Sequence, residues 1–338
     1  MPRLQNLPPK QAHLCLEIDR FVGNELGVDF HGNRLLLAVS GGVDSVALLA
    51  WAAAMRHKWQ AHLHCAHLDH GLRPESPSER ARVHALCEQL RIPCVSGRSL
   101  TPCYARRNNL GNEEAGRILR YRYLHGVARR QGCDYLLTAH HANDLAEDNL
   151  MRLLRGAGWP ALAGMPAWDP NRRLIRPFLL TPKKRLQALV EAAGLSWQED
   201  TSNADPAYQR NRIRHQILPL LLKENPHFLE TLAQTWRQAQ ADSALFDQLL
   251  AEARQTEERT PRGRLAPRAT LESLPPALRA RWYKAILDQI GPGQAVSENI
   301  SRLDALFREK KSGKMVQFPG DKQATVTREG IIFGWKRD

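Results

Sequence analysis

A glycine turn between an apolar run and a helix-like stretch constrains this chain more than any other feature. Residues 35–39 are Leu-Leu-Leu-Ala-Val, residues 40–45 are Ser-Gly-Gly-Val-Asp-Ser, and residues 46–51 have the composition of a helix. A buried strand that runs into such a turn leaves unpaired N–H groups at the positive end of the following helix dipole. Glycine lets the backbone approach a phosphate closely. We therefore predict an anion site formed by Ser40, Gly41, Gly42, Val43, Asp44 and Ser45.

Asp44 suggests which anion this is, because a bare carboxylate repels phosphate. A Mg²⁺ ion between the carboxylate and the phosphates removes that conflict, so the segment favours a nucleoside triphosphate bound with its metal. The Walker pattern G-x-x-x-x-G-K-[ST] occurs nowhere in the chain. The segment instead resembles the pyrophosphate loop of the ATP pyrophosphatases, which implies cleavage between the α- and β-phosphates. The alternative is a glycine turn that only connects a strand to a helix.

Charge is the second strong signal. The 48 Lys and Arg residues against 35 Asp and Glu residues give a formal net charge of +13, and the basic residues recur throughout the 338-residue chain. This balance favours a polyanionic partner such as nucleic acid, although a generally basic proteome would have the same effect. The chain has no run of about 18 apolar residues and no apolar signal core at its start, so we expect a cytoplasmic protein with no membrane partner.

The six cysteines give no sign of a metal site or a disulfide framework. They are Cys15, Cys65, Cys87, Cys94, Cys103 and Cys133, with no C-x-x-C pair and no zinc-finger spacing. Cytoplasmic thiols are usually reduced, so disulfides are not expected. We accordingly expect a variant without cysteines to keep its activity.

Strand-like and helix-like segments alternate over roughly the first 200 residues, which predicts an α/β fold with a doubly wound, mostly parallel sheet. A helical linker and a small mixed α/β domain are expected to follow, with boundaries at 1–215, 216–260 and 261–338. The predicted strands are 34–39, 61–66, 92–95, 135–138 and 174–175, with 315–318, 323–327 and 331–333 near the end. The predicted helices are 45–55, 78–90, 112–130, 143–154, 182–193, 271–290 and 297–307, and residues 256–267 are expected to form a loop.

Ligands on such sheets bind at the carboxyl ends of the strands. The segments 40–45, 67–73 and 138–144 each follow a predicted strand, so they should converge at one edge. His70 and Arg73 in the second segment could contact the nucleotide. Packing or capping by the histidines is the alternative.

Two further groups of charged residues are candidates. Arg117 and Arg120 lie near Glu114 and Tyr121 on a predicted helix, where arginine can clamp phosphate bidentately or form solvated ion pairs. Arg210, Arg212 and Arg214 could meet RNA phosphates or belong to a solvated basic helix start.

Asp144 and Glu147 stand three residues apart at a predicted helix start, so their carboxylates share a face. Complementing the helix dipole is an ordinary explanation for two acids at that position. The same pair could also hold an ammonium group or position an amine nucleophile.

Taken in order, these pieces resemble the bacterial tRNA(Ile)-lysidine synthetases. The matching residues are S-G-G-V-D-S at 40–45, H-L-D-H-G-L-R at 67–73, E-x-x-R-x-x-R-Y at 114–121, T-A-H-H-A-N-D-x-x-E at 138–147, R-G-A-G at 155–158, and E-D-T-S-N with Y-Q-R-N-R-I-R at 199–214. The resemblance covers roughly 34–222 and continues more weakly beyond.

The resemblance implies a ligase that joins free L-lysine to C2 of the wobble cytidine in an isoleucine tRNA with a CAU anticodon. ATP and Mg²⁺ would be required, and AMP and diphosphate released. It implies that residues 40–45 with His70 and Arg73 hold ATP, with Asp44 toward the metal. Asp144 and Glu147 would bind lysine. Asp44, Arg117, His140 and Arg210 would act in catalysis, and Arg120, Arg212 and Arg214 would contact RNA.

Three alternatives belong to other classes. A tRNA 2-thiocytidine synthetase shares the loop but typically needs cysteine pairs, which this chain lacks. An NAD synthetase would not account for the basic surplus. A non-catalytic tRNA-binding protein would have no use for Asp44, Asp144 and Glu147. Lysine-dependent release of AMP separates an enzyme from a binder.

Overall fold

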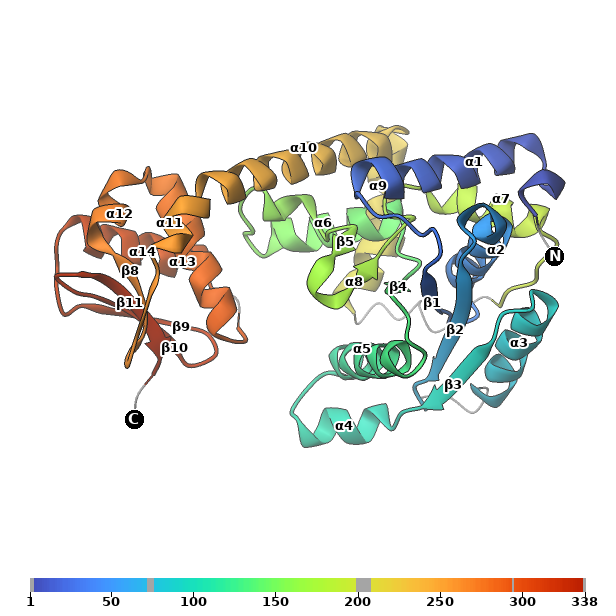
Figure 1. Ribbon diagram of the computed structural model, residues 1–338, viewed down its shortest axis with the longest axis horizontal. Helices are drawn as coiled ribbons and strands as arrows, with labels where there is room; N and C mark the ends of the chain where they lie inside the picture. The colour runs from blue at the N-terminus through green and yellow to red at the C-terminus, as the bar shows by residue number, and fades with distance from the viewer. Residues whose placement is uncertain (1–2, 72–75, 199–207, 294, 337–338) are drawn as a thin grey trace. The chain divides into compact units, whose positions relative to one another are not determined.

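The computed structural model describes residues 3–71, 76–198, 208–293 and 295–336 (Figure 1). The chain forms two compact units, each with its own sheet. Unit 1 comprises Met1–Met151 and Gly164–Ala233, and unit 2 comprises Arg152–Ala163 and Gln234–Asp338. The predicted boundaries at 215 and 260 stay a prediction. Within the described residues, no helix is both long and apolar enough to cross a bilayer.

Unit 1 is built on a six-stranded sheet with the order β3-β2-β1-β4-β6-β5. Its strands are β1 (Arg34–Ala38), β2 (His62–Asp69), β3 (Cys94–Arg98), β4 (Tyr135–Leu137), β5 (Trp168–Asp169) and β6 (Leu174–Ile175). All neighbours pair in parallel except β5, which pairs antiparallel with β6. The predicted mostly parallel α/β sheet is therefore confirmed, and the short β5 is the strand of this sheet that the sequence did not indicate.

Helices cover both faces of this sheet. They are α1 (Pro9–Arg20), α2 (Val43–Trp59), α3 (Ser76–Gln89), α4 (Thr101–Arg107), α5 (Asn112–Arg130), α6 (Ala142–Leu154), α7 (Lys183–Ala192), α8 (Gln209–Arg212) and α9 (Leu218–Glu224), with short turns η1 (Leu4–Asn6), η2 (Phe21–Glu25), η4 (Pro170–Arg172) and η6 (Ile213–Ile217). On one face, Leu124 and Val127 of α5 pack against Leu36, Ala66 and Leu136. Side chains alternate along a strand, so Cys65 and Leu37 point to the opposite face.

Helix α2 forms because the apolar stretch after the glycine turn is buried almost throughout. Residues 45–55 are all buried, so the helix runs through the interior instead of along the surface. Trp51 at its centre is fully buried and donates its indole N–H to the carbonyl of Cys15 on α1 at 3.1 Å. Helix α7 packs against the same helix. The N-terminus of α2 is thereby held rigidly at the end of β1.

Unit 2 contains a five-stranded antiparallel sheet with the order β7-β8-β11-β10-β9. Its strands are β7 (Glu258–Thr260), β8 (Gly263–Pro267), β9 (Met315–Phe318), β10 (Lys322–Val326) and β11 (Gly330–Trp335). Its helices are α10 (Phe228–Leu249), α11 (Ala251–Gln255), α12 (Arg268–Ser273), α13 (Pro276–Ile290) and α14 (Ser297–Arg308), with the turn η3 (Ala161–Ala163). Helix α10 begins in unit 1. Trp282, Tyr283 and Leu303 from the helices pack against Ile331 and Phe333 of the sheet.

Two sequence expectations fail in unit 2. Residues 256–267 were expected as a loop, but 258–267 form the β7–β8 hairpin. Glu258 and Arg259 lie exposed on the edge strand, and such charged residues give a strand the composition of a loop. The single helix expected over 271–290 is two helices, α12 and α13. The break lies at Pro275 and Pro276, where proline can begin a helix but cannot continue one.

Candidate active site

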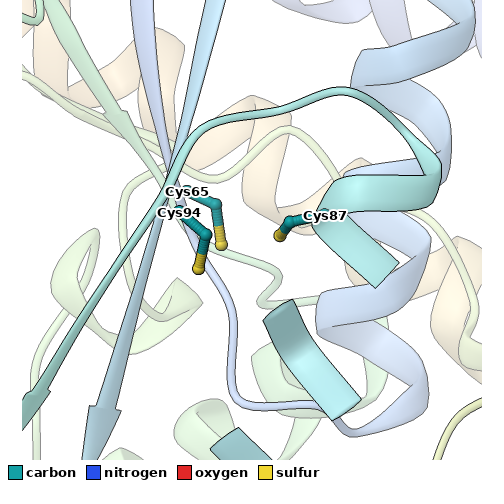
Figure 2. A group of neighbouring side chains, drawn as sticks. All are labelled: Cys65, Cys87 and Cys94. Carbon is teal, nitrogen blue, oxygen red and sulfur yellow. The ribbon is translucent and has the colours of Figure 1, made fainter. Parts of the chain in front are cut away.

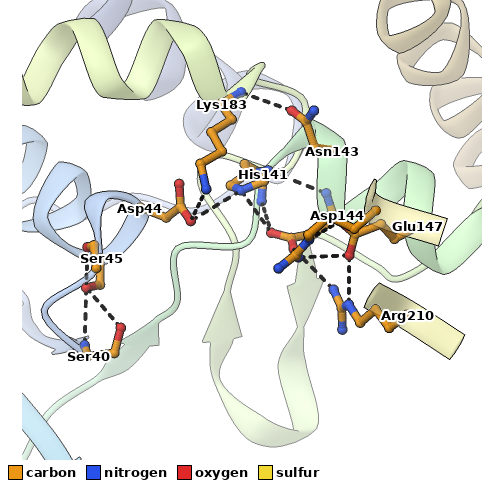
Figure 3. A network of polar contacts seen from close by, with 11 residues as sticks. Ser40, Asp44, Ser45, His141, Asn143, Asp144, Glu147, Lys183 and Arg210 are labelled. Atoms are coloured by element: carbon orange, nitrogen blue, oxygen red, sulfur yellow. Dashed lines mark hydrogen bonds and ion pairs between the residues drawn. The ribbon is translucent and has the colours of Figure 1, made fainter. Parts of the chain in front are cut away.

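The segment 40–45 connects β1 to α2, as expected, and the Ser45 hydroxyl organises it (Figure 3). The Ser45 Oγ accepts the backbone N–H groups of Ser40 at 3.2 Å and Gly41 at 3.0 Å, and it donates to the Gly42 carbonyl at 2.9 Å. The first intrahelical bond runs from the Val46 N–H to the Gly42 carbonyl. The N–H groups of the helical turn before Val46 are the ones left to face an anion.

Glycine is required at one position of this loop more than at the other. Gly41 has a φ of +99°, and a Cβ there would lie 3.3 Å from Cγ2 of Val83 on α3. Gly42, with a φ of −75°, has a backbone that any residue can adopt. Gly41 therefore lets the loop turn and lets α3 pack close against it.

Asp44 lies in the first turn of α2 and contacts two basic side chains. Its Oδ2 is 3.4 Å from His141 Nε2 and 3.4 Å from Lys183 Nζ. Burial raises the pKa of Asp44, but the hydrogen bond from His141 and the positive charges nearby outweigh it, and the net pKa is lowered. The carboxylate is thus ionised at neutral pH. Its Oδ1 is buried and has no partner among the described residues.

That orphaned oxygen fits a cation. A Mg²⁺ ion in an ATP site takes one or two protein carboxylates and completes its shell with phosphate oxygens and water. Asp44 supplies a carboxylate of this kind at the helix N-terminus where the phosphates are expected, so it is the residue that would hold the metal.

Asp144 joins the loop to a second group of charges. His141 precedes α6, and its backbone N–H donates to Asp144 Oδ2 at 3.0 Å. Asp144 therefore caps its own helix, and its charge at this helix start also fits the helix-dipole explanation that the sequence left open. His141 Nε2 is also 3.4 Å from Asp144 Oδ2, so this ring lies between Asp44 and Asp144. Burial lowers the pKa of His141, but the two carboxylates outweigh it and the net pKa is raised.

Glu147 and Asp144 are both engaged by arginines. Glu147, only 1% exposed, accepts from Arg210 Nε at 2.8 Å and from Arg214 Nε at 2.6 Å. The Nη2 atoms of the two arginines donate to Asp144 Oδ1, at 3.1 Å and 3.0 Å. The pKa of Asp144 is lowered although burial raises it, because His141, His140 and both arginines favour the charged form. Two buried carboxylates and two guanidinium groups form one network (Figure 3).

Comparison with known proteins gives the same assignment as the motifs. The PP-loop domain model matches residues 11–221. A tRNA(Ile)-lysidine synthase from Nitratidesulfovibrio vulgaris is 40% identical over 326 residues, which cover 91% of this chain and 94% of that protein. One from Geobacter sulfurreducens is 35% identical and covers 92% of this chain and 67% of that protein. The chain belongs to the tRNA(Ile)-lysidine synthase family. The predicted family and enzyme class are thereby confirmed.

A solved structure of the U34-tRNA thiolase NcsA from Methanococcus maripaludis matches with a TM-score of 0.55 and 15% identity, over 68% of this chain and 79% of that one. This likeness concerns the fold alone. It agrees with the six-stranded sheet of unit 1.

In this lysidine synthase family member, the three predicted segments do converge. A pocket of about 600 Å³ at the carboxyl ends of the strands contains residues from all three of them. Of the predicted site residues, those that line it are Ser40, Gly41, Gly42, Asp44, Ser45, His70, Arg120, His140 and Asp144. Arg73 lies outside the described residues. The E-D-T-S-N segment at 199–203 lies outside them too.

Other predicted residues lie elsewhere. Val43, Arg117 and Glu147 are not among the described residues that line the pocket, and Arg117 is exposed on α5. The three arginines that were expected to contact RNA or nucleotide do not lie together. Arg210 and Arg214 point to the Asp144 carboxylate, whereas Arg212 is exposed.

Of the histidines that line the pocket, His70 and His140 have lowered pKa values and are neutral at physiological pH. Burial, with Arg120 adding to it, lowers the pKa of His70 to about 4. Burial also lowers the pKa of His140 to about 3, and its Nδ1 lies 3.0 Å from the Thr138 hydroxyl. A neutral imidazole acts through hydrogen bonds and brings no positive charge. Beside His70 and His140, the positive charge therefore comes from Arg120.

Sequence reasoning missed Lys183 and His141. Lys183 opens α7 shortly after β6, at the same carboxyl edge as the other segments, and that position was the available signal. His141 follows His140 directly in the sequence, and only the fold shows that it is the ring between Asp44 and Asp144. Both contact Asp44.

Proposed function

We propose that this chain is a tRNA(Ile)-lysidine synthase. It uses ATP to join free L-lysine to C2 of the wobble cytidine in an isoleucine tRNA with a CAU anticodon, and it releases AMP and diphosphate. The observation that carries the proposal is one pocket that contains both the glycine loop with Asp44 and the acidic residue Asp144. The curated relatives support the substrate class.

The first proposed step is adenylation. The C2 carbonyl oxygen of the cytidine attacks the α-phosphorus of ATP, and the bond from that phosphorus to the bridging oxygen breaks, so that diphosphate leaves. The N–H groups of the first α2 turn bind the leaving diphosphate, and the Ser40 hydroxyl adds a donor when it turns from Ser45 Oγ, which lies 3.3 Å away. The Ser45 hydroxyl holds the loop in shape. Asp44 would hold Mg²⁺, which would offset the charge of the diphosphate, and Lys183 adds a cation beside the same carboxylate.

Arg120 and the neutral imidazoles of His70 and His140 face the pocket at the other strands. We assign Arg120 to the phosphate or ribose of the bound RNA and His140 to a hydrogen bond with the reacting nucleotide. Arg117 and Arg212 are exposed, which suits contacts with RNA further from the reaction.

The second proposed step uses lysine. Its ε-amine, as the free base, attacks C2; AMP leaves with the C2 oxygen, and the amine loses a proton. An amide-like carbonyl is a poor electrophile until its oxygen has become a phosphate ester, so adenylation must come first. The network of Asp144 and Glu147 with Arg210 and Arg214 offers both signs of charge. Free lysine carries both ammonium and carboxylate groups, and such a network can match each of them.

Binding of lysine then requires exchange within that network. In the structure the arginines satisfy the carboxylates. A lysine ammonium replaces part of the guanidinium contact, and the lysine carboxylate takes the guanidinium released. Since tRNA, ATP and lysine meet in the cytoplasm, we place the activity there.

The variant Asp44→Asn tests the proposal. It keeps the side-chain volume but removes the charge that the metal needs. AMP formation should fall at least about a hundredfold, which is the scale for loss of one preorganised electrostatic contact. Binding of the tRNA should stay close to that of the wild type. Asp288→Asn is a matched control, because it removes the same charge at an exposed position of unit 2. Near-normal AMP release by Asp44→Asn would refute the role of Asp44.

A further inference from the structure

Three cysteines that are far apart in sequence meet in unit 1 on the sheet face opposite α5. Cys65 lies on β2, Cys94 on β3 and Cys87 on α3, and their sulfur atoms all lie within 4.8 Å of one another (Figure 2). Cys65 and Cys94 are direct partners in the parallel pairing of the two strands. Cys65 and Cys87 are buried, and Cys94 is half-buried.

A histidine stands near them on the same helix as Cys87, outside the group whose ligand atoms lie within 4.8 Å of one another. His84 precedes Cys87 by three residues on α3, so both side chains point to the same side of the helix. The His84 Nε2 is 2.6 Å from the Ser96 hydroxyl. Ser96 is two residues after Cys94 on β3 and therefore shares its face of the sheet. The contact with Ser96 places the His84 ring on the β3 side of α3, and the ring would have to leave Ser96 to bind a metal.

We propose that Cys65, Cys87 and Cys94, with His84 as the fourth ligand, form a structural site for a thiophilic divalent cation, with Zn²⁺ the best fit. Three thiolates and one imidazole are a common tetrahedral set for structural zinc. At a Zn–S distance of about 2.3 Å the sulfur atoms would lie roughly 3.8 Å apart. Closing the widest gap between the sulfur atoms takes at most about 1 Å, and His84 must in addition turn from Ser96 toward them.

Burial as small apolar groups would explain each cysteine taken alone. It does not explain why Cys65, Cys87 and Cys94, from three separate elements, bring their sulfur atoms within 4.8 Å of one another. Binding of Zn²⁺ would displace the thiol protons to solvent.

The site would act on the pocket through α3. Val83 of this helix packs against Gly41 of the glycine loop, and Arg82 and Gln89 line the same pocket. A metal that ties α3 to β2 and β3 would hold that wall in place. The inference stands without the proposed function, because metal content and thermal stability report on it directly.

The first test is the metal content of the full chain, purified without chelators. We expect about one zinc per chain. After exchange with Co²⁺, the wild type should show a thiolate-to-cobalt charge-transfer band and intense tetrahedral ligand-field bands. Cys94→Ser should lose the bound zinc and both sets of bands. Cys133→Ser is the matched control, because it replaces another half-buried cysteine outside the cluster and should change neither.

His84→Gln tests the fourth ligand. It should weaken zinc binding at least tenfold and shift the cobalt bands while the charge-transfer band remains. Added zinc should raise the Tm of metal-free wild type but not that of Cys94→Ser. If Cys94→Ser does not fold, Co²⁺ titration of the wild type alone decides the question.

Three results would overturn the proposal. The first is a wild type with no stoichiometric zinc and no thiolate-to-cobalt band. The second is a disulfide between Cys65 and Cys94 in freshly purified protein. The third is iron with acid-labile sulfide in place of zinc, which would assign the cysteines to a different centre.

Discussion

Replacing Glu147 by glutamine separates the structural role of the charge network from its proposed role in binding lysine. The carboxylate accepts three hydrogen bonds: one from Arg210 at 2.8 Å, and two from Arg214 at 2.6 Å and 2.9 Å. Glutamine keeps the volume, but it turns an amide NH₂ toward a guanidinium group. Hydrogen bonds to charged groups contribute about 1.5–3 kcal/mol each, against about 1 for neutral ones.

The expected loss of stability is smaller than the 3–5 kcal/mol, roughly, that breaking a fully buried pair costs. The two arginine side chains are 30% exposed and keep their bonds to Asp144, so solvent screens part of the change. We expect about 2–3 kcal/mol. At about 2–4 °C per kcal/mol for a domain of roughly 200 residues, the Tm should fall by roughly 5–10 °C.

The functional readout is kinetic. Diphosphate release in a single turnover reports adenylation, and the KM for lysine reports the second substrate. Glu147→Gln should raise the KM for lysine at least about tenfold, the effect of one lost charge-assisted contact, and leave diphosphate release largely intact. Glu191→Gln is the matched control, because Glu191 is exposed on α7 and accepts from the neutral Gln187 at 3.1 Å; it should cost less than about 0.5 kcal/mol. An unchanged KM for lysine together with slower diphosphate release would refute the lysine assignment.

Two more variants probe the loop and its partner. Gly41→Ala should lower stability by about 1–3 kcal/mol and weaken ATP binding, because the φ of +99° strains any side chain, whereas Gly42→Ala should be much milder; equal effects on denaturant unfolding and the KM for ATP would contradict this. The raised pKa of His141 means that its contribution to stability is fully present below the unfolded pKa near 6.5 and is lost as pH rises through the folded pKa. His141→Asn should therefore be more destabilised relative to wild type at pH 6 than at pH 9, and a deficit independent of pH would contradict the ion pairs with Asp44 and Asp144.

The sequence predicted the parts of this structure that depend on local pattern. The apolar run before Ser40 and the helix after Ser45 placed the loop, and the rule for parallel sheets brought His70, His140 and Asp144 to the same edge. Those inferences needed only the order of strands and helices. Helices α1 and α4 and the strand β5 were missed, and so was the β7–β8 hairpin, where charged residues lie on an edge strand.

The sequence could not predict which charges pair. Arg210 and Arg214 lie between 63 and 70 positions from the carboxylates they contact, and nothing in their composition separates them from Arg212. The difference arises because positions 210 and 214 share one side of a helical turn and position 212 faces the other way. The cysteines were missed for the same reason, since only the fold brings Cys87 to Cys65 and Cys94.

The most direct test of the central claim is incorporation of labelled lysine into an unmodified isoleucine tRNA transcript with a CAU anticodon, in the presence of ATP and Mg²⁺. The control is the same transcript with U at the wobble position. We expect label only in the transcript with C, with one AMP released for each lysine joined. Cleavage of ATP to AMP with tRNA present but without any lysine in the product would contradict the account and point to a different nucleophile.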